Sequence, residues 1–378
     1  MRDSSFETAV RQGAFLVLAM ILGALVTGQL YLAIPLADNI AMQFSIDQKF
    51  AVFTSTVFGI SYALGLLAFG ALSDRKSRKQ VLLFGLIGLA AATGFVAYAW
   101  SFEWFLFSRA LQGLVAAIFP PTALALIPKV MPRRFQPLAL SAMGFSFLSS
   151  APISQLLVVD LDFSFQEGML WLTLVYILGA LAVFFILHGL ECTEGGFDQK
   201  TTEPRKQELH RNLPVLASWA AGLTILFAFV SFNQLAVSLN VPLQQLRWLA
   251  FLPLPLTFIA APLMQRCGSE VVAGFGLLVA SSAFYMAVIF GESGMLIASV
   301  LLSSGIAIAV PSLLAIVTSR TPPAKRGLAL GIYSFALFLG ASIAGPLSHA
   351  LMGLGLSIAL LPAMLALSLA TLLLLHLT

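Results

Sequence analysis

Twelve long apolar stretches follow one another along the chain, each bounded by charged or turn-forming residues. A helix needs about 20 apolar residues to cross the hydrocarbon core of a bilayer, so the pattern predicts twelve membrane-spanning helices. The predicted spans are 13–36, 51–72, 80–100, 103–128, 138–158, 168–190, 214–235, 246–264, 270–291, 293–318, 327–353 and 355–376. We expect Pro253, Pro255 and Pro262 to kink the eighth span, because proline removes a backbone donor.

Composition supports a chain that lies in the membrane. Hydrophobic residues make up 59% of the 378 residues, and charged residues only 10%. Soluble domains carry about 25% charged residues, so this chain has too few of them to build a water-facing surface. The spans are too long for the alternating ten-residue strands of a membrane barrel, and helices satisfy the backbone within each segment. We therefore expect an all-α integral membrane protein.

The basic residues gather in alternate loops and so predict the orientation. With both termini in the cytoplasm, seventeen of the twenty Lys and Arg residues lie on the cytoplasmic side. Lys49 and Arg247 fall on the outer side, and Arg109 is the one assigned to the interior of a span. This bias follows the positive-inside rule. It predicts a multi-pass protein of the bacterial inner membrane, and it explains the net charge of +4 without a nucleic-acid partner.

The two halves of the chain repeat one another. Leu-Ala-Leu occurs at 138–140 and again at 328–330, and Pro121 and Pro311 share the same offset of 190 positions. A polar segment, 191–213, separates the repeats and is typical of a cytoplasmic linker. We therefore predict an N-terminal six-helix bundle at 1–190, a linker at 191–213 and a C-terminal six-helix bundle at 214–378.

The loop between the second and third spans carries a recognisable motif. Its spacing, G-x-x-x-D-R-x-x-R, places Gly70, Asp74, Arg75 and Arg78 at the positions of the corresponding loop of major facilitator superfamily transporters, which it resembles. Ser77 stands where that family usually has a second glycine. The resemblance implies that these four residues form an inner gate, which holds the two halves together when the protein opens outward.

A second motif lies in the fourth span. Arg109-Ala110-Leu111-Gln112-Gly113 resembles the R-x-x-Q-G motif of the same superfamily. Together with the span count, the linker and the repeat, it makes the whole chain similar to the drug/metabolite:proton antiporter (efflux) branch. The resemblance implies two pseudo-symmetric six-helix bundles, with the arginine acting in proton coupling or in substrate contact.

Polar residues inside the spans are the candidates for the transport path. An arginine in hydrocarbon costs about 2.5–3.5 kcal/mol, so we expect Arg109 to face the cavity between the halves or a polar partner; the alternative is an arginine that reaches the outer headgroups. The substrate and proton pathway is predicted to comprise Arg109, Gln112, Gln29, Tyr31, Asp38, Asn233 and Gln234. The amides alternatively serve as contacts between helices, and Asp38, which lies at the outer end of the first span, alternatively is a solvated loop acid.

These features predict a secondary active transporter of a small organic molecule. The lone buried arginine favours an anionic or neutral substrate, a siderophore among them, exported in exchange for protons by a monomer. The fifth span retains only Ser149-Ser150-Ala151-Pro152 of the glycine-rich exporter pattern, which weakens the case for export. Proton-coupled uptake, a membrane receptor that binds without transporting and a lipid flippase remain the alternatives. The sequence has no phosphate-binding loop, metal-ligand cluster or nucleophile–base spacing, so we expect neither an enzyme nor a cofactor.

Overall fold

The computed structural model describes residues 2–72, 78–161, 163–188, 212–238, 241–322 and 325–376, and every regular element within them is a helix. The first half contains α1 (Arg2–Leu32), α2 (Ala37–Phe44), α3 (Gln48–Ala51), α4 (Phe53–Leu72), α5 (Arg78–Ala97), α6 (Phe102–Ala116), α7 (Phe119–Val130), the 3-10 helix η1 (Arg133–Phe135), α8 (Gln136–Leu161) and α9 (Phe165–His188). The second half contains α10 (Leu213–Ser238), α11 (Leu243–Phe251), the 3-10 helix η3 (Leu254–Leu256), α12 (Thr257–Cys267), α13 (Ser269–Phe290), α14 (Glu292–Arg320), α15 (Arg326–Met352) and α16 (Leu356–His376).

Twelve stretches of the described residues are long and apolar enough to cross a membrane, and each overlaps one of the twelve predicted spans. Two spans are interrupted at prolines. The fourth consists of α6 and α7, with Pro120 in the first turn of α7. The eighth consists of α11, η3 and α12, with Pro253 and Pro255 at the break. Because proline cannot donate a backbone hydrogen bond, the helix ends there, and the predicted interruption of the eighth span is seen at Pro253 and Pro255 but not at Pro262, which lies inside α12.

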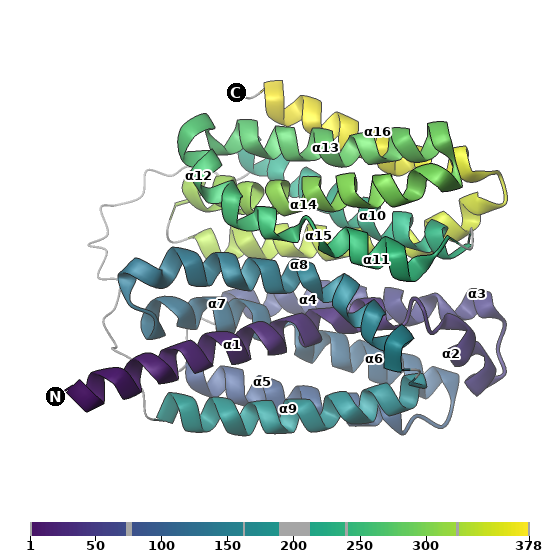
Figure 1. Cartoon of the computed structure of the whole chain (residues 1–378). Helices are drawn as coiled ribbons and strands as arrows, with labels where there is room; N and C mark the ends of the chain where they lie inside the picture. The colour runs from purple at the N-terminus through teal and green to yellow at the C-terminus, as the bar shows by residue number, and fades with distance from the viewer. Residues whose placement is uncertain are drawn as a thin grey trace.

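The helices of the two halves form two groups that lie side by side in Figure 1, α1–α9 in purple to teal and α10–α16 in green to yellow. The groups meet along a seam where α4 packs on α15, and where α8 packs on α11 and α12. The second span of one half thus meets the fifth span of the other, in both directions. The predicted linker, 191–213, lies almost entirely outside the described residues, so the domain boundaries remain a prediction.

Both termini lie at the same end of the helices, which we call the termini end; the opposite end, with α2 and α3, is the far end (Figure 1). The far end corrects one expectation. Asp38 does not lie at the end of the first span but in the first turn of α2, a separate short helix. The first span ends at Leu32, four positions before the predicted end, and a turn that contains Pro35 follows it.

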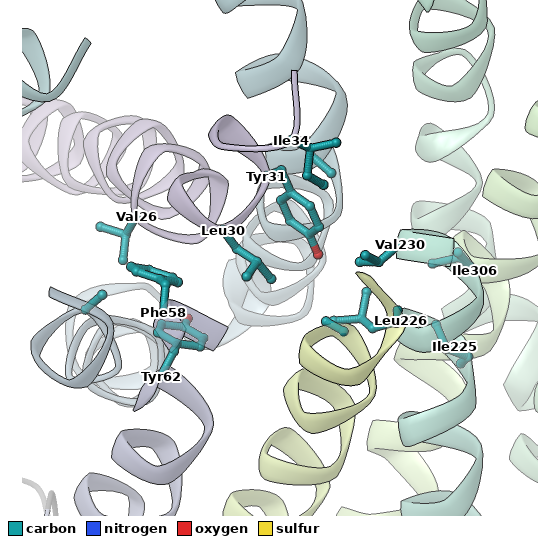
Figure 2. Packing of buried hydrophobic residues seen from close by; sticks show 14 of the residues in the cluster. Val26, Leu30, Tyr31, Ile34, Phe58, Tyr62, Ile225, Leu226, Val230 and Ile306 are labelled. Carbon is teal, nitrogen blue, oxygen red and sulfur yellow. The ribbon is translucent and has the colours of Figure 1, made fainter. Parts of the chain in front are cut away.

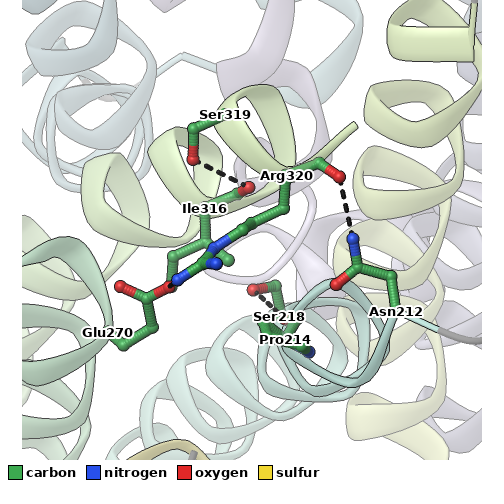
Figure 3. A network of polar contacts seen from close by, with 7 residues as sticks. All are labelled: Asn212, Pro214, Ser218, Glu270, Ile316, Ser319 and Arg320. Atoms are coloured by element: carbon green, nitrogen blue, oxygen red, sulfur yellow. Dashed lines mark hydrogen bonds and ion pairs between the residues drawn. The ribbon is translucent and has the colours of Figure 1, made fainter. Parts of the chain in front are cut away.

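A cluster of polar contacts joins three spans of the second half at the termini end (Figure 3). Arg320, the last residue of α14, pairs with Glu270 of α13 at 2.6 Å, and its backbone carbonyl accepts a hydrogen bond from the Asn212 side chain at 2.8 Å. These contacts join the seventh, ninth and tenth spans within one half. They do not reach the seam.

Glycines let helices approach closely at a crossing within each half. A Cβ at Gly113 of α6 would overlap the backbone carbonyl of Phe58 of α4, and a Cβ at Gly340 of α15 would overlap the carbonyl of Leu223 of α10. Small residues at helix crossings of membrane proteins permit this contact between backbones. The close approach at Gly113 also sets Phe58 beside the residue at the centre of the candidate site.

Candidate functional site: a buried arginine in the first half

Arg109 lies in the interior of the first half, on α6. Ser101 caps this helix by accepting a hydrogen bond from the Trp104 backbone N–H at 3.2 Å, and the helix carries Arg109 about two turns further in. None of the Arg109 side chain is exposed (0%). An arginine that reaches the lipid headgroups would be exposed, so the structure favours the expectation of a polar partner.

The partners of the Arg109 guanidinium are neutral. Nη1 donates to Gln112 Oε1 at 2.6 Å, and Nη2 donates to the Gln29 backbone carbonyl at 3.0 Å. Nε is buried without an acceptor, and no ion pair of the described residues involves Arg109. A buried charge without a counter-charge is costly. The site therefore has an unmet capacity to hold an anion.

Aromatic rings cover the guanidinium and connect it to the seam. Its carbon Cζ lies 4.4 Å from the ring centre of Phe58, within the range of a cation–π interaction, and 5.7 Å from that of Phe165. Phe58 stacks on Tyr62 of α4 with ring centres 5.8 Å apart, and Tyr62 meets Phe338 of α15 edge to face at 4.5 Å. Phe58, Tyr62 and Phe338 thus form an aromatic row from Arg109 to the second half.

A hydrogen-bond network extends from Arg109 through four spans of the first half. Gln112 Nε2 donates to Thr93 Oγ1 at 2.9 Å, and Gln29 Nε2 donates to the Tyr176 hydroxyl. Gln29 Oε1 is buried, and none of the residues that the structure describes donates to it. Three predicted path residues, Arg109, Gln112 and Gln29, therefore lie together on α1 and α6, and Thr93 and Tyr176 join them from α5 and α9.

Three other predicted path residues lie apart from this network. Tyr31, near the end of α1, points toward α10 in Figure 2, and its ring meets that of Phe229 edge to face at 5.9 Å. Asn233 donates to the Phe229 carbonyl of its own helix at 2.9 Å. Gln234 lines a small pocket with Leu235, Gly345, Ser348 and His349. The structure does not bring these residues to Arg109.

The acids of the far end are solvent-facing. Asp38 is exposed and accepts a hydrogen bond from Gln48 Nε2. Asp47 accepts one from the Lys49 backbone N–H at 3.1 Å, and this bond lowers the pKa of its carboxyl. Neither acid contacts Arg109. The geometry of Asp38 is that of the alternative interpretation, a solvated acid.

The predicted inner gate is described only in part. Asp74 and Arg75 lie within 73–77, outside the described residues, and Gly70 lies in the last turn of α4. Arg78, the first residue of α5, donates from Nη1 to the Ala125 carbonyl of α7 at 2.9 Å. This contact is within the first half, so the gate remains a prediction.

A second buried arginine, Arg247, was not among the predicted site residues. Arg247 was assigned to the outer side; it lies in the second turn of α11, within the eighth span, and is 2% exposed. Its Nε donates to Gln155 Oε1 of α8 at 3.0 Å, and its Nη1 donates to the Gln155 carbonyl at 3.3 Å. An arginine near the start of a predicted span was the signal that could have found it.

Comparison with known proteins gives relatives of this chain. Multidrug resistance protein 3 of Bacillus subtilis is 24% identical over 75% of the chain and 53% of its own length. Multidrug efflux pump LfrA of Mycolicibacterium smegmatis is 30% identical over 45% of the chain and 33% of its own length. The chain thus spans about half or less of the length of these curated relatives.

Fold and family agree with these relatives. The crystal structure of the human organic anion transporter MFSD10 (TETRAN) superposes with a TM-score of 0.69 at 16% identity, covering 97% of this chain and 98% of that one. At this identity the match shows the shared fold alone. The family profile described as Major Facilitator Superfamily matches residues 16–252, which is more than half of the chain. The protein is a multi-pass membrane protein that belongs to the Major Facilitator Superfamily of transporters.

Proposed function

We propose that the protein is a secondary active transporter that exports a small organic anion across the bacterial cytoplasmic membrane by alternating access, in exchange for protons. The family supports transport, and the names of the two curated relatives, a multidrug resistance protein and a multidrug efflux pump, support export. Drug-like compounds and carboxylated metabolites, siderophores among them, are the substrate classes that we propose.

The proposal of an anionic substrate rests on Arg109, which is buried and has no counter-charge among the described residues. The guanidinium keeps its proton at any physiological pH, so only an anion can neutralise it. Nothing in the described spans offers a matching site for a cation, because their acids lie within the first three positions of a span. A carboxylate that entered the site would find a charge, an unpartnered Nε and a network of neutral dipoles.

The aromatic row supplies a route for such an anion. Phe58 covers Arg109, and Tyr62 joins Phe58 to Phe338 of the other half. When the halves separate, Tyr62 loses Phe338, and the ring that shields the guanidinium is free to turn. Separation of α4 from α15 would thereby expose Arg109 to one side of the membrane. This is the structural step that we assign to alternating access.

Several parts of the proposal rest on the sequence. Both termini are placed in the cytoplasm because of the basic loops, and the transporter is taken to work as a monomer. We propose Asp38 as the residue to test for the coupling proton, because Arg109 cannot release one. Gly70, Asp74, Arg75 and Arg78 are proposed as the inner gate at the termini end.

The test is transport into everted membrane vesicles that contain the overproduced protein. Carboxyfluorescein serves as the organic anion and ethidium as the organic cation. We expect accumulation of carboxyfluorescein that requires a proton gradient and is lost on addition of an uncoupler, relative to vesicles without the protein. Accumulation of ethidium alone would overturn the anionic substrate, and anion flux that ignores the uncoupler would overturn proton coupling.

A further inference from the structure

The seam between the halves holds a second cationic group without a counter-charge. Arg247 of α11 is 2% exposed, forms no ion pair among the described residues, and has Gln155 as its hydrogen-bonding partner. Unlike Arg109, which lies inside one half, Arg247 spans the contact between α11 and α8. Its position makes it sensitive to the separation of the halves.

The unmet groups at this place are donors. Gln155 is 2% exposed, and its Nε2 is buried without an acceptor. Within the described residues, the hydrogen bonds of the Arg247 guanidinium both go to Gln155 oxygens. Gln155 Oε1 is already engaged by the guanidinium. A cluster of donors with its acceptor occupied fits a ligand that brings acceptor oxygens and negative charge, which is the chemistry of a carboxylate.

The internal repeat relates this place to the site in the first half. Ser299 lies 190 positions after Arg109, the offset that joins the two halves of the sequence. The Ser299 hydroxyl donates to the Leu246 backbone carbonyl at 2.9 Å, and Leu246 directly precedes Arg247. The second half therefore has a serine at the repeat position and buries an arginine on the eighth span instead. Each half thus holds a buried arginine, but the two lie on different spans.

We propose that Arg247 and Gln155 form a second carboxylate-binding site at the seam, in which the carboxylate of the transported anion displaces the Gln155 oxygen from the guanidinium. The inference rests on the proposed function. With the site empty, Arg247 holds α11 against α8; with a carboxylate bound, this contact is released. Occupancy of the site thus favours separation of the fifth and eighth spans.

The most direct variant is Gln155→Glu, which supplies a built-in carboxylate at the position of the proposed ligand. It should occupy Arg247 permanently and exclude the external anion. Arg247→Ala should remove the site. The matched controls are Gln245→Glu and Arg266→Ala. Gln245 is exposed on α11, the helix of Arg247, and Arg266 is exposed on α12, at the other end of the eighth span.

Binding is measured by thermal shift of the purified full chain with salicylate, citrate and carboxyfluorescein, each titrated separately. Because a charge-assisted hydrogen bond contributes about 1.5–3 kcal/mol, we expect the dissociation constant of a stabilising anion to rise roughly tenfold or more in Gln155→Glu and Arg247→Ala. Both controls should retain the wild-type value. Gln155→Glu should also melt no lower than the wild type without a ligand, since it compensates a buried charge.

The conformational part is measured by the distance between spin labels at Leu157→Cys and Leu252→Cys, two exposed positions on α8 and α11/η3, with Cys192 and Cys267 replaced by serine. The anion should lengthen this distance in the wild type and leave it unchanged in Gln155→Glu. Wild-type affinity in both Gln155→Glu and Arg247→Ala would overturn the site, even if the protein transports anions. If no anion stabilises the wild type, the proposed function fails first, and this inference fails with it.

Discussion

The two buried arginines, Arg109 and Arg247, have different surroundings. The Arg109 guanidinium is enclosed by a side-chain oxygen, a backbone carbonyl and two aromatic rings, all from the first half. The Arg247 guanidinium bonds across the seam to Gln155. Neutral partners reduce the cost of burying a charge but do not remove it, and natural proteins often give up stability where a function requires it.

The variant Arg109→Met therefore tests whether Arg109 serves transport or the stability of the fold. Methionine fills a similar volume without a charge, so the lost hydrogen bonds are offset by the removed desolvation cost. We expect the melting temperature of the purified variant to stay within a few degrees of the wild type, while anion transport is lost. Arg109→Lys should keep the charge and still lose most activity, because the compact ammonium lacks the planar fork with which the guanidinium reaches both Gln112 and Gln29. A large fall in melting temperature for Arg109→Met would mean that the residue is structural.

Two buried tyrosines provide a matched pair. The Tyr62 hydroxyl has no hydrogen-bond partner among the described residues, whereas the Tyr176 hydroxyl accepts a hydrogen bond from Gln29. Tyr62→Phe should therefore leave the melting temperature unchanged or raise it, since an unsatisfied buried group costs about 1–3 kcal/mol. Tyr176→Phe should lower the stability by about 1 kcal/mol. Equal destabilisation of both variants, measured by thermal unfolding in detergent, would contradict this reading of the site.

At the residue scale, some residues of the candidate site could be predicted from the sequence and others could not. Arg109 and Gln112 were predictable because a charge and an amide three residues apart in a membrane span need partners on one helix face. Phe58 was not, because one phenylalanine among the 31 of the chain carries no distinguishing signal. Thr93 and Tyr176 join the network only through tertiary contacts of α5 and α9 with α6 and α1.

At the scale of the elements, two features shape the surroundings of the site: the interrupted fourth and eighth spans, and the close helix crossings at glycines. Prolines divide the fourth and eighth spans, and this was predicted for the eighth because three prolines lie in it. The short helix α2 was not predicted, since its eight residues are too few for a clear pattern at the end of an apolar run. Close packing of α6 on α4 and of α15 on α10 depends on Gly113 and Gly340.

Gly340→Ala should consequently destabilise the second half. The added methyl group would overlap a backbone carbonyl that cannot move away without shifting α10, and overpacking of this kind costs about 1–3 kcal/mol. Gly168→Ala in α9 is the control, because a Cβ there meets nothing within 4 Å. In thermal unfolding, Gly340→Ala should have a lower melting temperature than the wild type, and Gly168→Ala should have the same melting temperature as the wild type. Equal melting temperatures would show that the crossing tolerates a larger separation.

On the scale of the whole molecule, the two halves meet through reciprocal pairs of spans, the second with the eleventh and the fifth with the eighth. Twelve spans and the family were predictable from the sequence because apolar length, loop charge and an internal repeat are all properties of the chain itself. The packing of the seam was not, because it depends on which face each helix turns toward the other half.

The predicted orientation can be tested with a native residue. Cys267 is a free, exposed thiol at the end of α12, at the termini end. With Cys192 replaced by serine, Cys267 should be protected from an impermeant maleimide in intact cells and become reactive once the membrane is permeabilised. Met42→Cys, exposed on α2 at the far end, should react in intact cells. The reverse pattern would place both termini outside.

The most direct test of the central claim, that Arg109 is the charge which carries an organic anion, is equilibrium exchange of carboxyfluorescein in proteoliposomes. Wild-type protein should exchange internal for external anion, and Arg109→Met, folded and reconstituted to the same density, should exchange it at less than about one tenth of that rate, a loss of more than 1.4 kcal/mol in transition-state stabilisation. Exchange by Arg109→Met at the wild-type rate would contradict the account.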